Sequence, residues 1–462
     1  MKHKIQDVDF IMIYEHKVRE LENMCLIKCE LEKRGYSVLI FHIEDPVIVK
    51  AVKPLYRAKA VMLMACYRNS TLEWHTKDFV IFDRVIDMQW ENIVYPKDEK
   101  AGKVFKNYSG IGKEVVRVSW GDANRRRLLE TAKMDPKKIK LVGHVGMDFL
   151  RDELKGYYLS KEELFPQYQI PMDKKTILFA SPFYADNLSE DYIKDMCSRF
   201  GEDWREYYAF MMKSEECILE WFKKLCKDRD DVQVIYRPHP GHIGRKMSEV
   251  AKQCDNFMII SDKSIKQWIL TCDIIYTGNS STFVEAFFAR KACHLLFPLE
   301  VTEGYELTII RDAKKITTYD EFYGTIDSVQ STFPVPESAI DDVYTVDWDK
   351  PSYVKFADMA EEVINDPYYQ LSKEQLKSYR TKHPLPVRIQ RKLVRIDFLY
   401  NIYLKAVNNS KWKFGWLEKQ RKIRQGSDAI AAKLQHESTN IEEIRQIQEK
   451  IKKQLKEAEK NE

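Results

Sequence analysis

The chain has 462 residues, of which 44% are hydrophobic, which is enough to form the cores of two or three domains. The longest apolar runs are only of strand length, so we expect neither a membrane-spanning helix nor a signal peptide. The nine cysteines are odd in number and scattered, which favours reduced thiols in a cytosolic protein over a disulfide framework or a zinc site.

The first 150 residues alternate between strand-like and helix-like patterns. Apolar runs typical of buried strands lie at 8–14, 37–42, 60–65, 84–88, 115–119 and 139–143. Amphipathic helices are expected at 18–34, where Gly35 ends the pattern, and at 122–133. This alternation predicts a parallel sheet covered by helices.

A second series of the same kind follows a polar and aromatic connector at 153–174. Strands are expected at 176–180, 232–236, 257–260, 273–276 and 292–297, and the longest helix at 204–227. We therefore expect an α/β chain with an N-terminal Rossmann-like domain at 1–152 and a second Rossmann-like domain at 153–350. Helices packing across the domains are expected at 351–410, and a charged helical tail at 411–462.

Two strand ends in the second series carry residues that can contact a phosphate. They are Val234-Ile235-Tyr236-Arg237-Pro238-His239-Pro240-Gly241 and Ile275-Tyr276-Thr277-Gly278-Asn279-Ser280-Ser281-Thr282-Phe283-Val284-Glu285. Open α/β sheets bind ligands at the carboxyl ends of their strands. The Gly-Asn-Ser-Ser-Thr turn would leave backbone N–H groups and the positive end of a helix dipole free to bind a phosphate.

Both motifs also have a purely structural interpretation. Thr282 and Glu285 have the spacing of a capping box that would only start the helix. Likewise, a histidine beside proline is commonly a structural residue at a strand end. The occurrence of two phosphate-competent strand ends in one domain favours a site for a nucleotide-activated donor.

Over roughly residues 8–330 the chain resembles bacterial surface-carbohydrate biosynthesis proteins of the GT-B architecture, related to capsule Kdo and sialyl transferases and to CDP-glycerol glycerophosphotransferases. The resemblance rests on Glu15-His16-Lys17-Val18-Arg19-Glu20-Leu21-Glu22, Ser119-Trp120-Gly121, Val142-Gly143-His144-Val145-Gly146-Met147-Asp148, Arg237-Pro238-His239-Pro240 and Ser280-Ser281. It implies two Rossmann-like domains facing a cleft. The Trp-His-Gly histidine of the glycerophosphotransferases has no clear counterpart in the first half of this chain.

The resemblance also implies roles for individual residues. His239, Ser280 and Ser281 would contact the phosphate of the donor, and Glu285 would accept hydrogen bonds from its ribose. Arg237 would either assist them or pin its loop by an ion pair. Asn279 and Thr282, in the same turn as the two serines, complete the expected donor site.

Removing a proton from the acceptor hydroxyl needs a base, expected at a strand end of the first domain. Glu91 is the first candidate, because the neighbouring Trp90 could desolvate it and raise its pKa, and Glu15 is the second. Arg19 and Glu20 would either contact the substrate or form a structural ion pair. The acidic run at 228–231 resembles a solvated turn, so we expect no metal and no cofactor besides the donor substrate.

The basic character of the chain is concentrated near the C-terminus, with 15 Lys/Arg against 3 Asp/Glu at 371–424 although the whole chain is only +4. Because aromatic residues accompany these charges, 387–424 is expected to meet an anionic membrane surface rather than nucleic acid. The alternative for 387–403 is a helix packed on the domains. Beyond this segment, isoleucines at helical spacing in 437–462 would bind a partner protein or a second copy.

These features together predict a cytoplasmic enzyme, peripheral at the inner face of the plasma membrane. It would be a glycosyltransferase that moves a sugar from a nucleotide-activated donor to a surface polysaccharide or its lipid-linked precursor, inverting or retaining. Transfer of a polyol phosphate from a CDP-polyol, as in teichoic acid synthesis, and a non-catalytic scaffold with a vestigial donor cleft are the alternatives.

Overall fold

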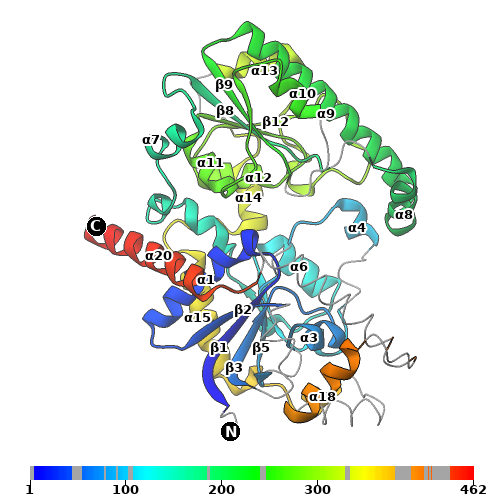
Figure 1. Ribbon diagram of the computed structural model, residues 1–462, viewed down its shortest axis with the longest axis vertical. Coiled ribbons are helices and arrows are strands. Elements are labelled where there is room, and N and C mark those ends of the chain that lie inside the picture. Colours follow the sequence, from blue (N-terminus) through cyan, green and yellow to red (C-terminus); the bar gives the residue numbers. More distant parts are fainter. Residues whose placement is uncertain are drawn as a thin grey trace. The chain divides into compact units, whose positions relative to one another are not determined.

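The computed structural model describes residues 5–43, 55–76, 80–89, 92–101, 108–184, 188–239, 246–327, 333–379, 397–409, 415, 418 and 438–461. The chain divides into two compact units. The first consists of residues 1–92, 105–145 and 349–452, and the second of residues 93–104, 146–348 and 453–462. Each unit is built around a β-sheet (Figure 1).

The sheet of the first unit has seven strands among the described residues, all paired in parallel. They are β1 (Gln6–Tyr14), β2 (Val38–His42), β3 (Tyr56–Leu63), β4 (Val80–Ile81), β5 (Val85–Asp87), β6 (Val116–Ser119) and β7 (Ile139–Leu141). Their order is β2-β1-β3-β5-β6-β7, and β4 pairs with β3. The strand order reverses between β1 and β3, so Glu15, which follows β1, lies at the point where such sheets bind ligands.

The helices of the first unit come from residues 17–130 and from residues beyond 351. They are α1 (Lys17–Lys33), α3 (Asn69–Thr76), α6 (Asp122–Glu130), α15 (Ser352–Asn365), α16 (Lys373–Ser378), α18 (Asp397–Asn408) and the first half of α20 (Ile441–Asn461). Beyond the end of α1, Arg34 donates to Asp358 of α15 at 2.7 Å. On α20, Gln448 and Ile451 are buried, and Gln448 donates to Glu32 of α1 at 2.8 Å.

The sheet of the second unit has the strand order of a Rossmann fold. Its parallel strands are β8 (Lys175–Ala180), β9 (Val232–Arg237), β10 (Phe257–Ile259), β11 (Ile274–Thr277), β12 (Cys293–Leu296) and β13 (Lys315–Ile316). They are arranged β10-β9-β8-β11-β12-β13, which is the order 3-2-1-4-5-6 of dinucleotide-binding sheets. The order reverses between β8 and β11, so the loops after these strands lie at the switch point.

The helices of the second unit cover both faces of its sheet (Figure 1). They are α4 (Pro96–Ala101), α7 (Lys161–Leu164), α8 (Glu190–Phe200), α9 (Asp203–Asp228), α10 (Lys246–Ala251), α11 (Ile265–Thr271), α12 (Thr282–Phe288), α13 (Tyr319–Ile326) and α14 (Glu337–Tyr344). Phe222 of α9, Met247 of α10 and Phe322 of α13 share one apolar core with Phe179 and Tyr236 of the sheet. Helices α11 and α12 lie on the other face.

The expected fold class, two Rossmann-like parallel-sheet domains, is confirmed, and each strand expected from an apolar run is present. Strand β3 begins earlier than expected, because Tyr56 and Arg57 pair with Gln6 and Asp7 of β1. Strands β4 and β13 were not anticipated, since two residues are too few to give a periodic pattern.

Residues 93–104 belong to the second unit, whereas the domain ranges expected from the sequence put them in the first. Lys97 of α4 donates to the Asp203 carboxylate and, at 2.9 Å, to the Tyr305 hydroxyl. The Tyr95 ring packs edge-on against Tyr207, with the ring centroids 6.4 Å apart. These are tertiary contacts between distant residues, and local sequence patterns do not encode them.

Candidate functional site

The turn at 278–282, between β11 and α12, lies at the switch point of the second sheet. Gly278 is packed so closely that a Cβ atom there would lie 3.1 Å from Pro182 Cγ, in the loop after β8. Within the turn, the Thr282 N–H donates to Ser280 Oγ at 3.3 Å, and the Ser280 N–H donates to the Gly278 carbonyl at 2.8 Å. Glycine therefore allows the turn to run against the neighbouring strand end.

The capping-box interpretation of Thr282 and Glu285 is wrong. Helix α12 begins at Thr282 itself, Ser281 is the residue before it, and Ser281 makes no side-chain capping bond within the described structure. The same unit does contain capping boxes, at Ser160 with Glu163 and at Thr318 with Glu321. The Glu285 carboxylate is thus not used to start its helix.

Glu285 lies instead among charged groups from two other elements. Its side chain is half-buried, and burial raises the pKa of Glu285, while the positive charges of Lys266 and Arg237 oppose that rise. Within the described residues, the carboxylate makes no hydrogen bond or ion pair. Both of its oxygens therefore remain available to hydroxyl donors.

Arg237, at the end of β9, holds the loop that follows β10. Its guanidinium donates to the Asp262 carbonyl at 2.6 Å and to the Lys263 carbonyl. Lys263 has a φ of 59°, so this loop makes a tight turn at that point. Burial lowers the pKa of Arg237, and the negative charges of Asp262 and Glu285 oppose the shift. Of the two roles expected for Arg237, the contacts show loop support, through backbone carbonyls rather than through an ion pair.

His239 and Asn279 have contrasting surroundings. His239 is exposed, and its ring contacts that of Tyr184 after β8 with centroids 6.3 Å apart. Asn279 is held by the backbone, since it donates to the Tyr305 carbonyl at 2.7 Å and accepts from the Leu307 N–H at 3.0 Å. The structure thus gathers the predicted donor-site residues of the second unit at one edge of its sheet, with β8 between His239 and the serine turn.

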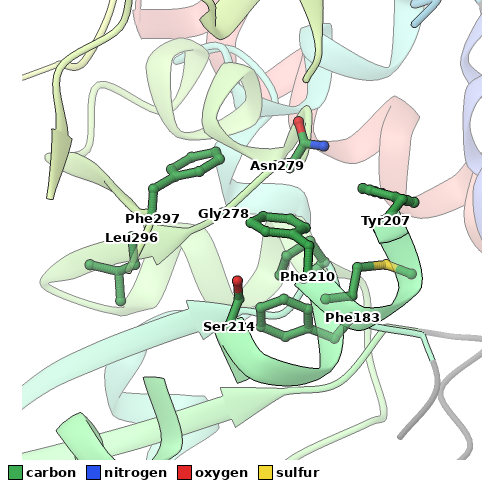
Figure 2. Close-up of a pocket in the computed structure, with 10 residues that line it drawn as sticks. Phe183, Tyr207, Phe210, Ser214, Gly278, Asn279, Leu296 and Phe297 are labelled. Atoms are coloured by element: carbon green, nitrogen blue, oxygen red, sulfur yellow. The ribbon is translucent and has the colours of Figure 1, made fainter. Parts of the chain in front are cut away.

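An aromatic pocket opens at the same edge, on the α9 face of the sheet (Figure 2). The pocket is shallow, and the space inside it that a solvent molecule can reach is about enough for one water. It is lined by Pro182 and Phe183 after β8, Tyr207, Phe210, Met211 and Ser214 of α9, Gly278 and Asn279 after β11, and Leu296 and Phe297 at the end of β12. Sequence analysis did not predict this pocket, because its walls come from four separate segments.

The predicted residues of the first unit surround the start of α1. Glu20 is completely buried, and its Oε2 accepts hydrogen bonds from the N–H groups of Glu15 at 2.7 Å and His16 at 3.2 Å. Its other oxygen accepts from Arg19 at 2.9 Å, so the expected ion pair of Arg19 and Glu20 is present. Burial raises the pKa of Glu20, and these donors oppose the rise. The start of α1 is therefore already occupied by a carboxylate, while the Glu15 side chain is half-buried.

Glu91, the first candidate for the base, lies outside the described residues. A buried ion pair of Asp87 and Arg117, which sequence analysis missed, stands at the end of β5, just before it. Arg117 also donates to Gln89 Oε1 at 2.8 Å. The available signal in the sequence was Arg117, because an arginine inside an apolar, strand-like run needs a buried partner for its charge.

The described residues contain no cluster of side chains suited to a metal ion and no helix long and apolar enough to cross a membrane. On α18, Phe398 is 71% exposed and Ile402 is 49% exposed, whereas most of 387–424 lies outside the described residues. On α20, Ile444 and Ile451 are buried within the first unit. The centre of the isoleucine stripe therefore packs inside this chain and is not available to the partner expected from the sequence.

No family model matches the chain, and no curated protein matches it. Similarity to solved structures is distant and concerns the fold. The wall teichoic acid polymerase TagF is 13% identical, with a TM-score of 0.45, and the match covers 77% of this chain and 89% of TagF. A glycosyltransferase from Rickettsia africae is 14% identical, with a TM-score of 0.37 and coverage of 81% and 98%. A UDP-N-acetylglucosamine 2-epimerase is 13% identical, with a TM-score of 0.43 and coverage of 82% and 99%.

Proposed function

We propose that the second unit binds a nucleotide-activated donor and that the protein transfers a sugar from it to a surface polysaccharide or a lipid-linked precursor. The observation that carries the proposal is the Glu285 carboxylate. It is half-buried at the switch point of a Rossmann sheet, it takes no part in capping, and it lies in the field of Arg237 and Lys266. A carboxylate that keeps both oxygens available suits the two hydroxyls of a ribose.

The difference between the two units supports placing the donor in the second. At the start of α1, the Glu20 carboxylate already accepts the N–H groups of Glu15 and His16, so a second anion there would be repelled. At the start of α12, the turn carries no carboxylate cap. The Ser280 hydroxyl lies 3.1 Å from that of Thr282, and the Ser281 hydroxyl hydrogen-bonds to Tyr344. A phosphate would be held there by these donors, with His239 stabilising the charge that develops on the leaving group.

The remaining chemical role is removal of the acceptor proton, which we assign to a carboxylate of the first unit. Glu91 stays the first candidate and Glu15 the second. Glu15 follows β1 at the switch point of its own sheet, and its backbone is fixed by Glu20. A membrane-bound acceptor would suit the exposed Phe398 and Ile402 of α18, which we propose contact an anionic inner membrane surface.

Calorimetric titration of the full chain with CMP, CDP, UDP and GDP tests the donor site. We expect one of them to bind, and to stabilise the protein by about 2.7 kcal/mol at a hundredfold excess over its Kd. Glu285→Gln should weaken that binding about tenfold, because a charged acceptor of ribose hydroxyls is lost. Glu303→Gln, an exposed glutamate of the same unit, is the matched control and should bind normally.

Two outcomes would contradict the proposal in different ways. Absence of binding by all four nucleotides would reject a donor site in the second unit. Normal binding by Glu285→Gln would reject only the ribose role. If a CDP-polyol, rather than a nucleotide sugar, supplies the transferred group in an activity assay, the protein is a polyol phosphotransferase.

A further inference from the structure

Asn279, the residue before Ser280 in the turn at 278–282, joins that turn to the loop that follows β12. Its side-chain nitrogen donates to the Tyr305 carbonyl at 2.7 Å, and its side-chain oxygen accepts from the Leu307 N–H at 3.0 Å. One amide group thus holds two backbone groups of the loop. Because Ser280 is the next residue, a displacement of Asn279 would move the backbone of the proposed phosphate site directly.

The loop after β12 is held in turn by the segment 93–101, which includes α4. Lys97 donates to the Tyr305 hydroxyl at 2.9 Å, and the Lys97 backbone N–H donates to the Gly304 carbonyl at 3.2 Å. Gly304 has a φ of 82°, and a Cβ atom there would lie 3.0 Å from Lys97 Cβ, so the loop and the segment pack directly against each other. The ion pair of Lys97 with Asp203 fixes the same ammonium group to the start of α9.

A second connection to Asn279 runs through tyrosine rings. The Tyr207 ring is stacked on that of Tyr305, with the centroids 4.4 Å apart and an angle of 9° between the ring planes. The Tyr207 hydroxyl lies beside the Tyr95 hydroxyl and the side chain of Asn279. Two separate routes therefore lead from the segment 93–101 to the amide group of Asn279.

We infer that Lys97 is a positioning residue for the donor phosphate. By fixing the loop that contains Tyr305, it holds Asn279 and the turn at 278–282 in the geometry that binds the ligand. This inference rests on the proposed function, which puts the phosphate at that turn. A turn that is ordered before binding does not have to be ordered by the ligand, and pre-organisation of this kind raises affinity. Asn279 acts in the same way, because the loop occupies both ends of its amide group.

Hydrogen exchange of the full-length, ligand-free protein, followed by mass spectrometry, tests the connection itself. In Lys97→Met we expect faster exchange in peptides that cover 303–308 and 278–284, because the loop that Asn279 holds is no longer fixed on its other side. Lys97→Arg keeps the charge and the donors and should restore wild-type exchange. Arg229→Met is the matched control, since Arg229 joins Asp231 to Asp327 in the same unit, and it should leave both peptides unchanged.

Nucleotide affinity then tests the consequence for the donor. For the nucleotide that binds the wild type in calorimetry, Lys97→Met should weaken binding about tenfold, and Lys97→Arg should restore most of that loss. Tyr305→Phe removes only the hydroxyl and keeps the stacked ring, so it should weaken binding about threefold even if Lys97→Met does not fold. Arg229→Met also loses an ion pair but should bind as tightly as the wild type, which separates positioning from a general loss of stability.

The outcomes distinguish this inference from the proposed function. Unchanged exchange at 278–284 in both Lys97→Met and Tyr305→Phe would overturn the inference, whether or not a nucleotide binds. Faster exchange with full nucleotide affinity, or an equal loss of affinity in Arg229→Met, would also overturn it, and the donor site would stand. If no nucleotide binds the wild type, the proposed function fails and the positioning role fails with it, even where exchange responds.

Discussion

Asp87 and Arg117 form an ion pair in which both side chains are completely buried in the first unit. Asp87 also accepts hydrogen bonds from the N–H groups of Cys66 at 2.6 Å and Gln89 at 2.9 Å. Arg117 donates to the carbonyls of Cys66 and Gly112, both at 2.9 Å. The pair therefore ties the loops after β3 and β5 to β6, at the edge of the sheet where the acceptor chemistry is proposed.

Arg117→Met should destabilise the protein by about 3–5 kcal/mol, because it leaves the Asp87 charge buried without its partner. Urea denaturation of the full chain measures this. The matched control is Arg125→Met, whose guanidinium pairs with Asp122 on the surface at 3.5 Å and should cost less than about 1 kcal/mol. Equal losses for the two variants would mean that the buried pair does not organise this edge.

Glu285→Gln should change the pH dependence of stability. Because burial raises the pKa of Glu285 in the folded state, the protonated carboxyl favours folding, and this contribution is lost as the pH rises above about 4.3, the usual glutamate value. The ligand-free variant should therefore gain in stability relative to wild type between pH about 4 and 7. Denaturation curves at several pH values measure the difference, and a variant that is less stable at neutral pH would show that the carboxylate has a structural partner.

His239→Ala should reduce transfer about 10²-fold to 10³-fold, the loss expected when one donor to a leaving-group charge is removed. His239 is exposed, so the melting temperature should stay the same. Initial rates with the donor identified by calorimetry measure the effect. His16→Ala, another exposed histidine, is the control, and wild-type rates for His239→Ala would assign His239 a structural role.

Replacing Phe398 and Ile402 together by serine should weaken binding to anionic vesicles while nucleotide binding stays intact. Each exposed apolar side chain would contribute about 1.5–3 kcal/mol if fully buried in an interface. Co-sedimentation with vesicles containing phosphatidylserine, at low and high salt, measures the effect. If the wild type does not sediment with these vesicles even at low salt, the membrane proposal is wrong.

Local patterns were sufficient for most of the fold. Strand β9 was predictable because its side chains at 232–236 are buried on both faces of the sheet. A strand of that kind is recognised in the sequence as a nearly continuous apolar run. The buried pair of Asp87 and Arg117 was not predictable, since its partners are 30 residues apart and neither residue is part of a recognisable motif. Long-range electrostatics and packing decide such features.

The candidate site shows the same division. The turn at 278–282 was recognisable because its glycine and hydroxyl residues follow a strand directly. A capping box would require Thr282 to be the residue before the helix, but α12 begins at Thr282 itself. Sequence periodicity does not fix the start of a helix to within one residue. The aromatic pocket combines side chains from 182 to 297 and required the folded chain.

The docking of residues 93–104 has a consequence for dissecting this protein. The chain passes between the units at 92/93, 104/105, 145/146, 348/349 and 452/453, so no single cut releases the second unit intact. A fragment of 146–348 would lack Lys97, leaving the Asp203 carboxylate and the Tyr305 hydroxyl without the cation that joins them. Its tyrosine cluster would lose Tyr95 at the same time. Such a fragment should self-associate through the uncovered rings, and a soluble donor-binding domain would need α4 fused back onto it.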